Sequence, residues 1–299
     1  MPHPATVIYL VDASVYVFRA YYSIPADMVD GAGNLINAVY GYARFLGDLL
    51  ERAQPTHIVV AFDESINTSF RNDIYPEYKA NREDPPEDLM WQFRQCKRVT
   101  AAMGVTSYAD ERFEADDIIG TLAYSLRERA KNFVVVTRDK DLAQLIRSGD
   151  EYWDYAANRR YGYDDIVDKI GVRAEQIPDF LALAGDSVDN IPGVPGVGPK
   201  TAIALLQYFD TLDSVYENLD EVAKVPVRGA KKLGARLAQH EEKARLSRQL
   251  TGVARDAPVE NTMRSMRWSK PDLAMLESLY DELDIGDALR LQAKRLVNG

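Results

Sequence analysis

Residues 7–12, VIYLVD, form a short apolar, β-branched run that ends in an aspartate. The same pattern returns in residues 58–63, IVVAFD, and in residues 133–137, FVVVT, which the charged segment RDKD follows at 138–141. Runs of this kind, without alternation of apolar and polar residues, are typical of strands buried on both faces of a sheet. We therefore predict three central strands, each with an aspartate at or just beyond its carboxyl end.

Helical patterns separate the predicted strands. Residues 36–53 and 115–130 carry apolar side chains at three- and four-residue spacing, and the second segment begins with acidic residues that suit a helix N-terminus. Strands that alternate with helices predict an α/β fold with a parallel sheet. Beyond about residue 175 we predict helices at 176–184 and 201–208, further helices with basic faces to about residue 250, and a last helix at 271–283.

The composition indicates a soluble globular protein. Of the 299 residues, 46% are hydrophobic and 27% are charged, and the absence of any run of 18 apolar residues predicts no transmembrane helix. Residues 1–5 lack the basic start of a signal peptide, so the apolar run after them is interpreted as a strand. Cys96 is the only cysteine, which excludes intramolecular disulfides and cysteine-ligated zinc and favours the cytoplasm, in a bacterium the compartment of the nucleoid.

The net charge of −10 weighs against a nucleic-acid partner, because phosphate binding needs lysine and arginine. Two features offset this charge. Acidic residues grouped around bound cations are partly neutralised. The basic residues are also unevenly distributed, since they gather in residues 71–98 and again in residues 224–248.

Acidic residues gather where the predicted strands end and where predicted helices begin; Asp186 and Asp189, three residues apart, would share one helical face. In open parallel sheets, ligands bind beyond the carboxyl ends of the strands, so these side chains are expected to share one site. Clustered carboxylates repel one another unless cations hold them, and oxygen ligands without histidine or cysteine favour Mg²⁺ or Mn²⁺. Any one of them alone would fit a turn or a helix cap, but their joint occurrence predicts a metal site. The candidate ligands are Asp12, Asp63, Glu114, Asp116, Asp117, Asp139, Asp141, Asp186 and Asp189.

A polar, basic and aromatic segment at residues 65–86 interrupts the α/β pattern. We expect either a mobile loop or a pair of helices that projects from the sheet. If the segment is helical, Lys79 and Arg82 are neighbours on one face and could hold a phosphate, and Tyr78 could stack on a base. A solvated, charged loop is the alternative.

Residues 193–198, GVPGVG, bring three glycines together before a predicted helix. Glycine lets backbone N–H groups approach a phosphate closely, the helix N-terminus favours an anion, and Lys200 adds positive charge. A tight turn between two helices is the alternative. The spacing is not that of a Walker A loop, and the segment does not follow a strand, so binding of a nucleoside triphosphate is disfavoured.

The motifs together resemble the 5′-nuclease (flap endonuclease) family, in particular the 5′–3′ exonuclease domain of bacterial DNA polymerase I and its free-standing relatives. The resemblance extends over nearly the whole chain and rests on LVDAS, AFDES, SFRNDIYPEYKANR, FEADDIIGTLA, TRDKDLAQL and GDSVDNIPGVPGVGPKTA. It implies a PIN-like nuclease core with a parallel sheet at 1–175 and a helical arch at about 65–90, a helix–three-turn–helix DNA-binding module at 176–256, and a C-terminal helical extension at 257–299. It also implies a free-standing protein in which no polymerase domain follows the nuclease.

The resemblance also assigns roles to the candidate residues. It implies two divalent metal ions, with Mg²⁺ expected and Mn²⁺ able to substitute, and K⁺ held by backbone carbonyls of the glycine hairpin. Asp12, Asp63, Glu114, Asp116 and Asp117 would serve the first metal, some of them through water, and Asp139, Asp141, Asp186 and Asp189 the second. Lys79 and Arg82 would act on the scissile phosphate as catalytic residues, and DNA contacts would come from Arg19, Arg71, Tyr78, Gly193, Val194, Gly196, Val197, Gly198 and Lys200.

The implied activity is that of a structure-specific 5′ nuclease, both flap endonuclease and 5′–3′ exonuclease, which leaves 5′-phosphate and 3′-hydroxyl ends in replication and repair. The implied partners are branched or 5′-flap DNA and polymerases or ligases, without a membrane, and the implied state is a monomer. Two alternatives stay open. One is a non-catalytic protein that binds branched DNA, and the other is a PIN-type ribonuclease, which would need neither the hairpin module nor Asp186 and Asp189.

Overall fold

The computed structural model describes residues 6–64 and 68–298. The predictions for residues 1–5 and for the start of the arch at 65–67 lie outside the described residues. Within the described residues, no helix is long and apolar enough to cross a membrane.

The described chain is built around one six-stranded sheet in the order β3-β2-β1-β4-β5-β6. Neighbouring strands are parallel except β5 and β6, which are antiparallel. The chain moves outward from β1 to β3 and then returns to the other side of β1, and ligands bind at such a switch point in open α/β sheets. The strands are β1 (Val7–Asp12), β2 (His57–Asp63), β3 (Thr106–Asp110), β4 (Asn132–Val136), β5 (Glu151–Asp154) and β6 (Arg159–Tyr161). The predicted α/β fold is confirmed, and the three predicted strands are the central ones, β1, β2 and β4.

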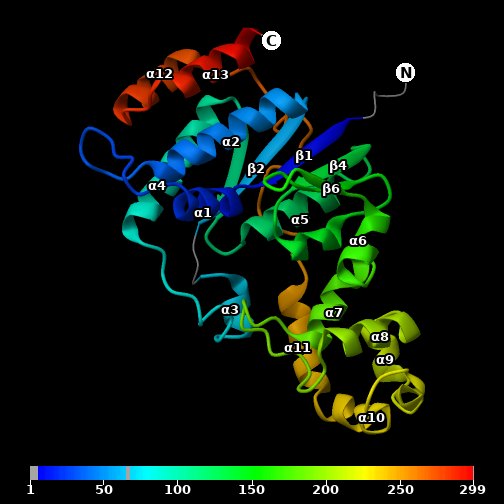
Figure 1. Ribbon diagram of the computed structural model, residues 1–299. Helices are drawn as coiled ribbons and strands as arrows, with labels where there is room; N and C mark the ends of the chain where they lie inside the picture. Colours follow the sequence, from blue (N-terminus) through cyan, green and yellow to red (C-terminus); the bar gives the residue numbers. More distant parts are fainter. Residues whose placement is uncertain (1–5, 65–67, 299) are drawn as a thin grey trace, which may run out of the picture.

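Helices cover both faces of the sheet (Figure 1). The strand side chains alternate between the two layers. Val60 and Phe62 of β2 belong to the core beneath α1, α2 and α4, whereas Val59 and Ala61 belong to the core beneath α5. Burial on both faces explains why the sequences of these strands are continuous apolar runs. These helices are α1 (Ala13–Ser23), α2 (Asn37–Ala53), α4 (Glu87–Ala102) and α5 (Ala115–Ser125).

The segment before α4 is mostly a series of turns. Within residues 68–86 the only helix is the short α3 (Phe70–Ile74), and the turns that follow it include hydrogen bonds from Tyr78 N to Tyr75 O and from Arg82 N to Lys79 O, both 2.9 Å. Of the two alternatives for this segment, the pair of projecting helices is therefore wrong for its described part.

A helical region follows the sheet and lies at the lower right of the molecule in Figure 1. Leu181, Leu205 and Leu237 of this region belong to the same hydrophobic core as α5, so the helical module and the α5 face of the sheet pack as one body. The helices predicted at 176–184 and 201–208 are confirmed as α7 and α8. The elements of the region and of its connection to the sheet are η1 (Lys140–Leu145), α6 (Tyr163–Ile170), η2 (Ala174–Gln176), α7 (Ile177–Ala184), α8 (Pro199–Phe209), α9 (Leu212–Glu217), η3 (Glu221–Lys224), α10 (Ala230–Gln239) and α11 (Glu241–Thr251).

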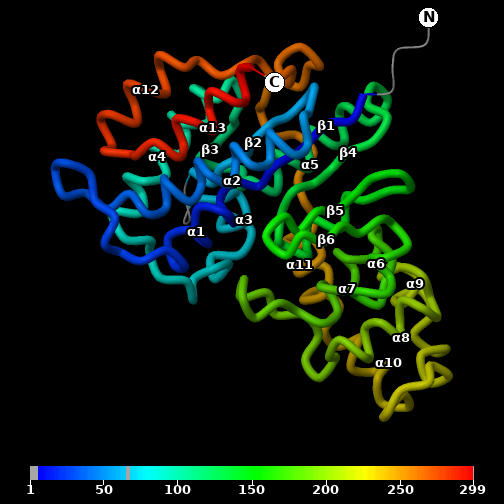
Figure 2. The backbone as a smooth tube through the Cα atoms, turned by 45° about the horizontal axis from the view of Figure 1, so that its top comes forward, coloured from blue at the N-terminus to red at the C-terminus, as the bar shows by residue number. Residues whose placement is uncertain are grey.

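After α11 the chain returns to the sheet and crosses to the opposite side of the molecule (Figure 2). Met266 O accepts from Ile58 N at 2.8 Å, and Trp268 N donates to Thr56 O at 3.1 Å, so this return segment lies beside the start of β2. Two helices then pack against α4 and α2: α12 (Leu273–Glu282), close to the predicted 271–283, and α13 (Asp287–Asn298), which was not predicted.

Candidate active site

Two aspartates at neighbouring strand ends form the centre of the site. Asp12 ends β1 and caps α1, so its carboxylate accepts from Val15 N at 3.5 Å and from the Thr137 hydroxyl at 2.8 Å. Asp63 ends β2, and its carboxylate accepts from Ala115 N, the first residue of α5, at 2.8 Å. Because β1 and β2 are in parallel register, the sheet itself sets these two side chains side by side.

Aspartates from α5 and from the loop after β4 join the two strand-end residues. Burial, followed by repulsion from Asp63 and then Asp139, raises the pKa of Asp12 to about 8. Burial and repulsion from Asp139, Asp12 and Asp63 raise the pKa of Asp116 well above its ordinary value. Burial and repulsion from Asp139 raise the pKa of Asp141 to about 7. The structure therefore brings the carboxylates of β1, β2, α5 and the β4 loop within mutual electrostatic range, as the sequence predicts.

The donor set of this cluster suits a hard divalent cation. Within residues 6–64 and 68–298, no three Asp, Glu, His or Cys side chains already stand in the arrangement that holds a metal ion. Asp141 Oδ1, however, is buried without a hydrogen-bond partner among the described residues, and buried polar atoms ordinarily have one. Oxygen-only donors that repel one another and leave an oxygen unsatisfied fit Mg²⁺ or Mn²⁺, which would supply the missing positive charge.

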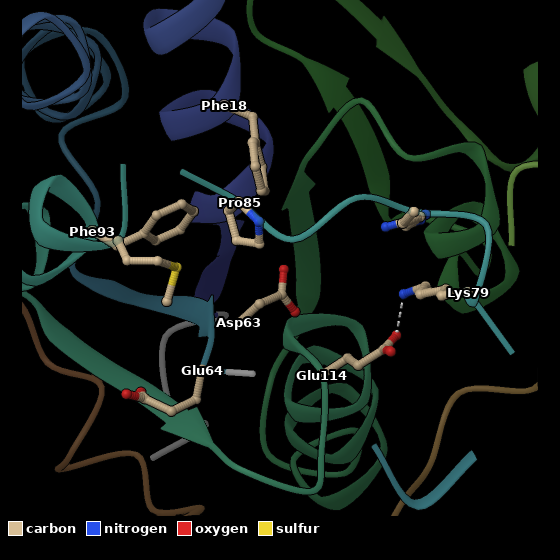
Figure 3. A pocket seen from close by; sticks show the side chains of 9 residues that line it. Phe18, Asp63, Glu64, Lys79, Pro85, Phe93 and Glu114 are labelled. Carbon is tan, nitrogen blue, oxygen red and sulfur yellow. Dashed lines mark hydrogen bonds and ion pairs between the residues drawn. The ribbon is translucent and has the colours of Figure 1, made fainter. Parts of the chain in front are cut away.

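Basic side chains of the 75–82 turns occupy the edge of the acidic cluster. Lys79 Nζ donates to Glu114 Oε2 at 2.7 Å and lies 3.9 Å from Asp189 Oδ2, and Arg82 pairs with Asp189. Burial alone would raise the pKa of Glu114, but the positive charges of Lys79 and Arg71 outweigh it and lower that pKa. Figure 3 shows Lys79 reaching Glu114 beside Asp63 in one pocket. Lys79 and Arg82 thus lie together, although they are not on a helix.

The loop at 186–191 carries the last two acidic candidates. Asp186 and Ile191 exchange backbone hydrogen bonds at 3.0 and 2.7 Å, so the residues between them form a tight turn. The predicted helical face shared by Asp186 and Asp189 is wrong. Asp189 instead points at Arg82, and Asp186 lies 3.6 Å from Lys140 Nζ.

The structure contradicts the roles predicted for Arg71 and Asp117. Arg71 is only 3% exposed, and its guanidinium forms two hydrogen bonds to Asp117 at 2.6 and 2.7 Å, so it does not present its charge to DNA. The Asp117 carboxylate also accepts from the N–H groups of Glu114 and Ala254. With its oxygens already engaged, Asp117 is not a free metal ligand.

The structure also differs from the predicted roles of Tyr78 and of three residues in the glycine hairpin. The Tyr78 ring is buried, and its hydroxyl donates to Glu114 at 3.1 Å, so it does not offer a face to a base. The N–H groups of Gly193, Val194 and Val197 donate to Ser247, Leu183 and Val194, so they are not available to a phosphate. The predicted phosphate contacts through these three N–H groups are therefore wrong.

Gly198 and Lys200, at the end of the hairpin and the start of α8, are open to solvent. A methyl group added at Gly198 would meet no described protein atom within 4 Å, whereas one added at Gly193 would lie 2.3 Å from Gly185 N. Gly193 is therefore needed for packing inside the protein, and Gly198 leaves open space in front of a helix N-terminus.

The exposed Arg19 does not line the acidic pocket. It lies with Arg44 and Tyr155 in a separate surface hollow between α1, α2 and the turn after β5. Its predicted contact with DNA would therefore be made away from the carboxylates.

Several residues of the site were not predicted from the sequence. Thr137 holds Asp12, and the Ser14 hydroxyl accepts from Asp63 N at 3.0 Å; both hydroxyls stand within two residues of the acidic motifs, which is a usable signal. The acidic pocket also has an apolar side, visible in Figure 3. That side is formed by Phe18, Pro85, Met90 and Phe93. These four come from three separate segments, so no local pattern marks them.

Carboxylates at the switch point of a parallel sheet, with basic side chains over them, define a class: an α/β protein with an acidic site suited to cations and phosphate. A sequence model described as "5'-3' exonuclease, N-terminal resolvase-like domain" matches residues 7–171. A second, described as "5'-3' exonuclease, C-terminal SAM fold", matches residues 172–274. The chain therefore belongs to the 5′-3′ exonuclease family.

Curated relatives with similar sequences are bacterial DNA polymerases I. The chain is 38% identical to that of Pseudomonas aeruginosa over 295 residues, which are 97% of this chain and 32% of the relative. It is 38% identical to that of Rhizobium leguminosarum over 85% of this chain and 25% of the relative, and 37% identical to that of Bacillus caldotenax over 92% and 31%. The chain thus spans between a quarter and a third of the length of these relatives.

Solved structures of nucleases share the fold. T5 5′-exonuclease with bound zinc superposes with a TM-score of 0.66 at 18% identity, over 98% of both chains. The catalytic core of Rad2 in complex with DNA substrate gives a TM-score of 0.63 at 16% identity, over 98% of this chain and 91% of that one.

Proposed function

We propose that this chain is a structure-specific 5′ nuclease that hydrolyses DNA phosphodiesters with the help of two divalent cations. The observation that carries the proposal is one pocket that brings the strand-end carboxylate of Asp63 and the carboxylate of Glu114 together with Lys79 and Arg82. Asp12 and Asp116 lie within electrostatic range of Asp63. Membership of the 5′-3′ exonuclease family supports it. So do the neighbouring structures of T5 5′-exonuclease with bound divalent metal ions and of the Rad2 catalytic core in complex with DNA substrate.

The metal-binding residues that we propose are the predicted set without Asp117. Mg²⁺, or Mn²⁺ in its place, would supply the charge that activates a water and stabilises the leaving oxygen. The chain itself provides buried, mutually repelling oxygens for these ions. The proposed ligands are Asp12, Asp63, Glu114, Asp116, Asp139, Asp141, Asp186 and Asp189.

Lys79 and Arg82 are the proposed catalytic residues. Each now neutralises a carboxylate, Lys79 on Glu114 and Arg82 on Asp189. Cations bound at these carboxylates would free both side chains to turn to the scissile phosphate, where positive charge stabilises the transition state. The apolar side of the pocket, which includes Phe18 and Phe93, would take the sugar or base of the reacting nucleotide.

The start of α8 is the proposed seat of the DNA backbone. Gly198 gives a phosphate close access to the helix N-terminus, and Lys200 adds charge there. K⁺ held by hairpin carbonyls belongs to this proposal, and so does a contact from Arg19. Such contacts reach phosphates rather than base edges, so specificity would follow the shape of a branched or 5′-flap DNA.

The wider assignments of the resemblance remain part of the same proposal. We propose a nuclease core at 1–175, a DNA-binding module at 176–256 and a C-terminal extension at 257–299; the two family models, which meet at residues 171 and 172, support the first division. We also propose that the protein acts as a monomer in the bacterial cytoplasm, in replication and repair beside polymerases or ligases.

A cleavage assay tests the proposal. Purified protein is incubated with an end-labelled 5′-flap DNA, with the same duplex lacking a flap, and with single-stranded RNA, each in Mg²⁺ and in EDTA. We expect cleavage near the flap junction in Mg²⁺ alone, with 5′-phosphate and 3′-hydroxyl products. Flap binding without cleavage in Mg²⁺ would support the non-catalytic binder, and preferential cleavage of RNA would support the ribonuclease.

A further inference from the structure

Arg71 and Asp117 form a buried pair that connects α3, the start of α5 and the end of α11. Arg71 belongs to α3, before the Lys79 turns, and Asp117 lies in the first turn of α5. The two side chains are 4% and 0% exposed and form a two-pronged ion pair with distances of 2.6 and 2.7 Å. Planar, bidentate pairs of this kind fix geometry more strongly than a single ionic contact does.

Arg71 also closes the end of a helix in the DNA-binding module. Its Nε donates to Leu250 O at 2.8 Å and its Nη2 donates to Gly252 O at 3.0 Å. Leu250 belongs to the last turn of α11, where carbonyl groups lack partners within the helix and positive charge is favourable. The guanidinium thus joins the 68–82 segment to α11.

Asp117 ties the same contact to the acidic cluster. Its carboxylate accepts from Glu114 N at 3.1 Å, which closes the N-terminal turn of α5, and from Ala254 N at 2.8 Å, just after α11. Glu114 of this turn lines the pocket, and Asp116 lies within electrostatic range of the other aspartates. Any shift of Asp117 therefore moves the turn that carries both of them.

Aromatic rings complete the connection between Arg71 and the pocket. The guanidinium carbon lies 4.7 Å from the centre of the Phe70 ring and 5.8 Å from that of Tyr78. The Tyr78 hydroxyl in turn donates to Glu114, and Tyr78 precedes Lys79. Arg71 and Asp117 thus contact the base of the catalytic turns, the start of α5 and the end of α11 together.

From these contacts we infer that Arg71 and Asp117 act as one positioning unit, which holds the Lys79 segment and the Glu114–Asp116 turn in register with the DNA-binding module. In this role the two residues act through the segments that they hold, without a direct contact to DNA or metal. The inference rests on the proposed function for its effect on cleavage, but not for its effect on the folded protein.

Four variants test the positioning unit: Arg71→Gln, Asp117→Asn, the double variant Arg71→Gln/Asp117→Asn, and Asp116→Asn as the matched control for a metal-binding residue. Each is first examined by thermal unfolding. Calorimetric titration with Ca²⁺, binding of 5′-flap DNA in Ca²⁺ and single-turnover cleavage in Mg²⁺ are then measured below the melting temperature of the variant.

Either single variant leaves one partner buried and uncompensated, so we expect lower melting temperatures and single-turnover rates about 10–100-fold lower at saturating DNA. Flap-DNA affinity should stay within about threefold, because no DNA contact is removed. Ca²⁺ affinity should fall less in Asp117→Asn, which only loosens the turn that carries Glu114 and Asp116, than in Asp116→Asn, which removes a proposed ligand. The double variant should be more stable and faster than either single variant, because no unpaired charge remains.

Three results would overturn the inference. Loss of Ca²⁺ binding in Asp117→Asn comparable to that in Asp116→Asn would make Asp117 a metal ligand. A large loss of flap affinity in Arg71→Gln, with a smaller dependence on salt, would make Arg71 a DNA contact. A double variant no better than the worse single variant would show that the two residues do not act as a unit. If wild-type protein cleaves no flap, the proposed function fails, while the unfolding and Ca²⁺ measurements still judge the pair.

Discussion

Two sets of ion pairs lie a few residues apart in this molecule, and they differ in how completely they are enclosed. The inner pair, Arg71 with Asp117, is 4% and 0% exposed, and each residue also forms hydrogen bonds with backbone groups near the end of α11. The outer pairs join Lys79 to Glu114 and Arg82 to Asp189, with Lys79 13%, Asp189 19% and Arg82 40% exposed. The enclosed inner pair is expected to stay intact, whereas the more exposed outer pairs can exchange their basic partner for another cation.

This difference suggests how one acidic site can be neutralised by two kinds of counter-ion, basic side chains and divalent cations. Clustered carboxylates need positive charge at all times, and the outer lysine and arginine provide it when no divalent cation is bound. Bound cations would take over that charge and release both side chains toward a phosphate. The inner pair would hold the surrounding segments in place during this exchange.

The largest effect is expected from a carboxylate inside the cluster. Asp116→Ala removes a side chain that interacts with Asp12, Asp63 and Asp139. We predict a loss of single-turnover flap cleavage of about 1,000-fold, the size seen when one preorganised electrostatic group is removed from an active site. Flap binding in Ca²⁺, measured by fluorescence anisotropy, should change little, and wild-type cleavage rates in this variant would rule out the metal assignment.

A smaller loss is expected from an outer cation. Lys79→Ala removes a charge that would act on the phosphate only after exchange, so the single-turnover rate should fall by about 100-fold. Flap affinity should stay nearly constant. An unchanged rate at saturating DNA would show that Lys79 serves only as a counter-ion for Glu114.

Two glycines of the hairpin, Gly198 and Gly193, allow a test variant and a matched control. Gly198→Ala places a methyl group in open space at the start of α8, so flap affinity should fall about tenfold, or ~1.4 kcal/mol, with only a slight loss of melting temperature. Gly193→Ala places a methyl group against Gly185 N, and Gly193 has a φ of +57°, so this variant should unfold more easily. Equal flap affinity in Gly198→Ala and wild type would contradict a backbone contact at α8.

The smallest effect is a pH dependence of the metal-free protein. The pKa of Asp12 rises to about 8 and that of Asp141 to about 7 on folding, from an ordinary value of 3.8. The folded protein thus holds these protons more tightly than the unfolded chain, so their stabilising contribution is full below about pH 4 and is lost as the pH rises through 7 to 8. In EDTA, the melting temperature should fall by several degrees between pH 5.5 and pH 8.5.

Divalent cations should reverse that loss. Mg²⁺ should raise the melting temperature more at pH 8.5 than at pH 5.5, because protons compete with it for the same oxygens. Asp12→Asn, which removes one of the titrating groups, serves as the control and should show a weaker pH dependence in EDTA. A metal-free protein that is equally stable at both pH values would contradict the raised pKa values.

The sequence was sufficient to predict the central strands and their aspartates, because buried parallel strands are uninterrupted apolar runs and a strand end is local. It was insufficient for β3 and β6, whose sequences TSYAD and RRY contain no such run. It also missed α1, since Asp12 ends the strand and caps the helix at once, leaving no turn residues between them.

Local sequence patterns could not predict which charged residues are buried. Arg71 reads as one more basic residue in a basic segment, and only the tertiary fold places it against Asp117 and against Leu250, 179 residues further along the chain. The same holds for Tyr78, whose position in the motif suggests a stacking ring although the ring is buried against Glu114. Long-range packing decides which members of a charged motif face solvent.

The central claim is that divalent cations and the outer basic residues are alternative counter-ions for the same carboxylates. Chemical labelling of Lys79, quantified by peptide mass spectrometry in EDTA and in saturating Ca²⁺, tests it most directly, with the exposed Lys200 as an internal reference. We predict that Ca²⁺ increases the labelling rate of Lys79 several-fold while that of Lys200 stays constant, as release from Glu114 requires. An unchanged or slower rate at Lys79, with Ca²⁺ binding verified in the same sample, would contradict the exchange.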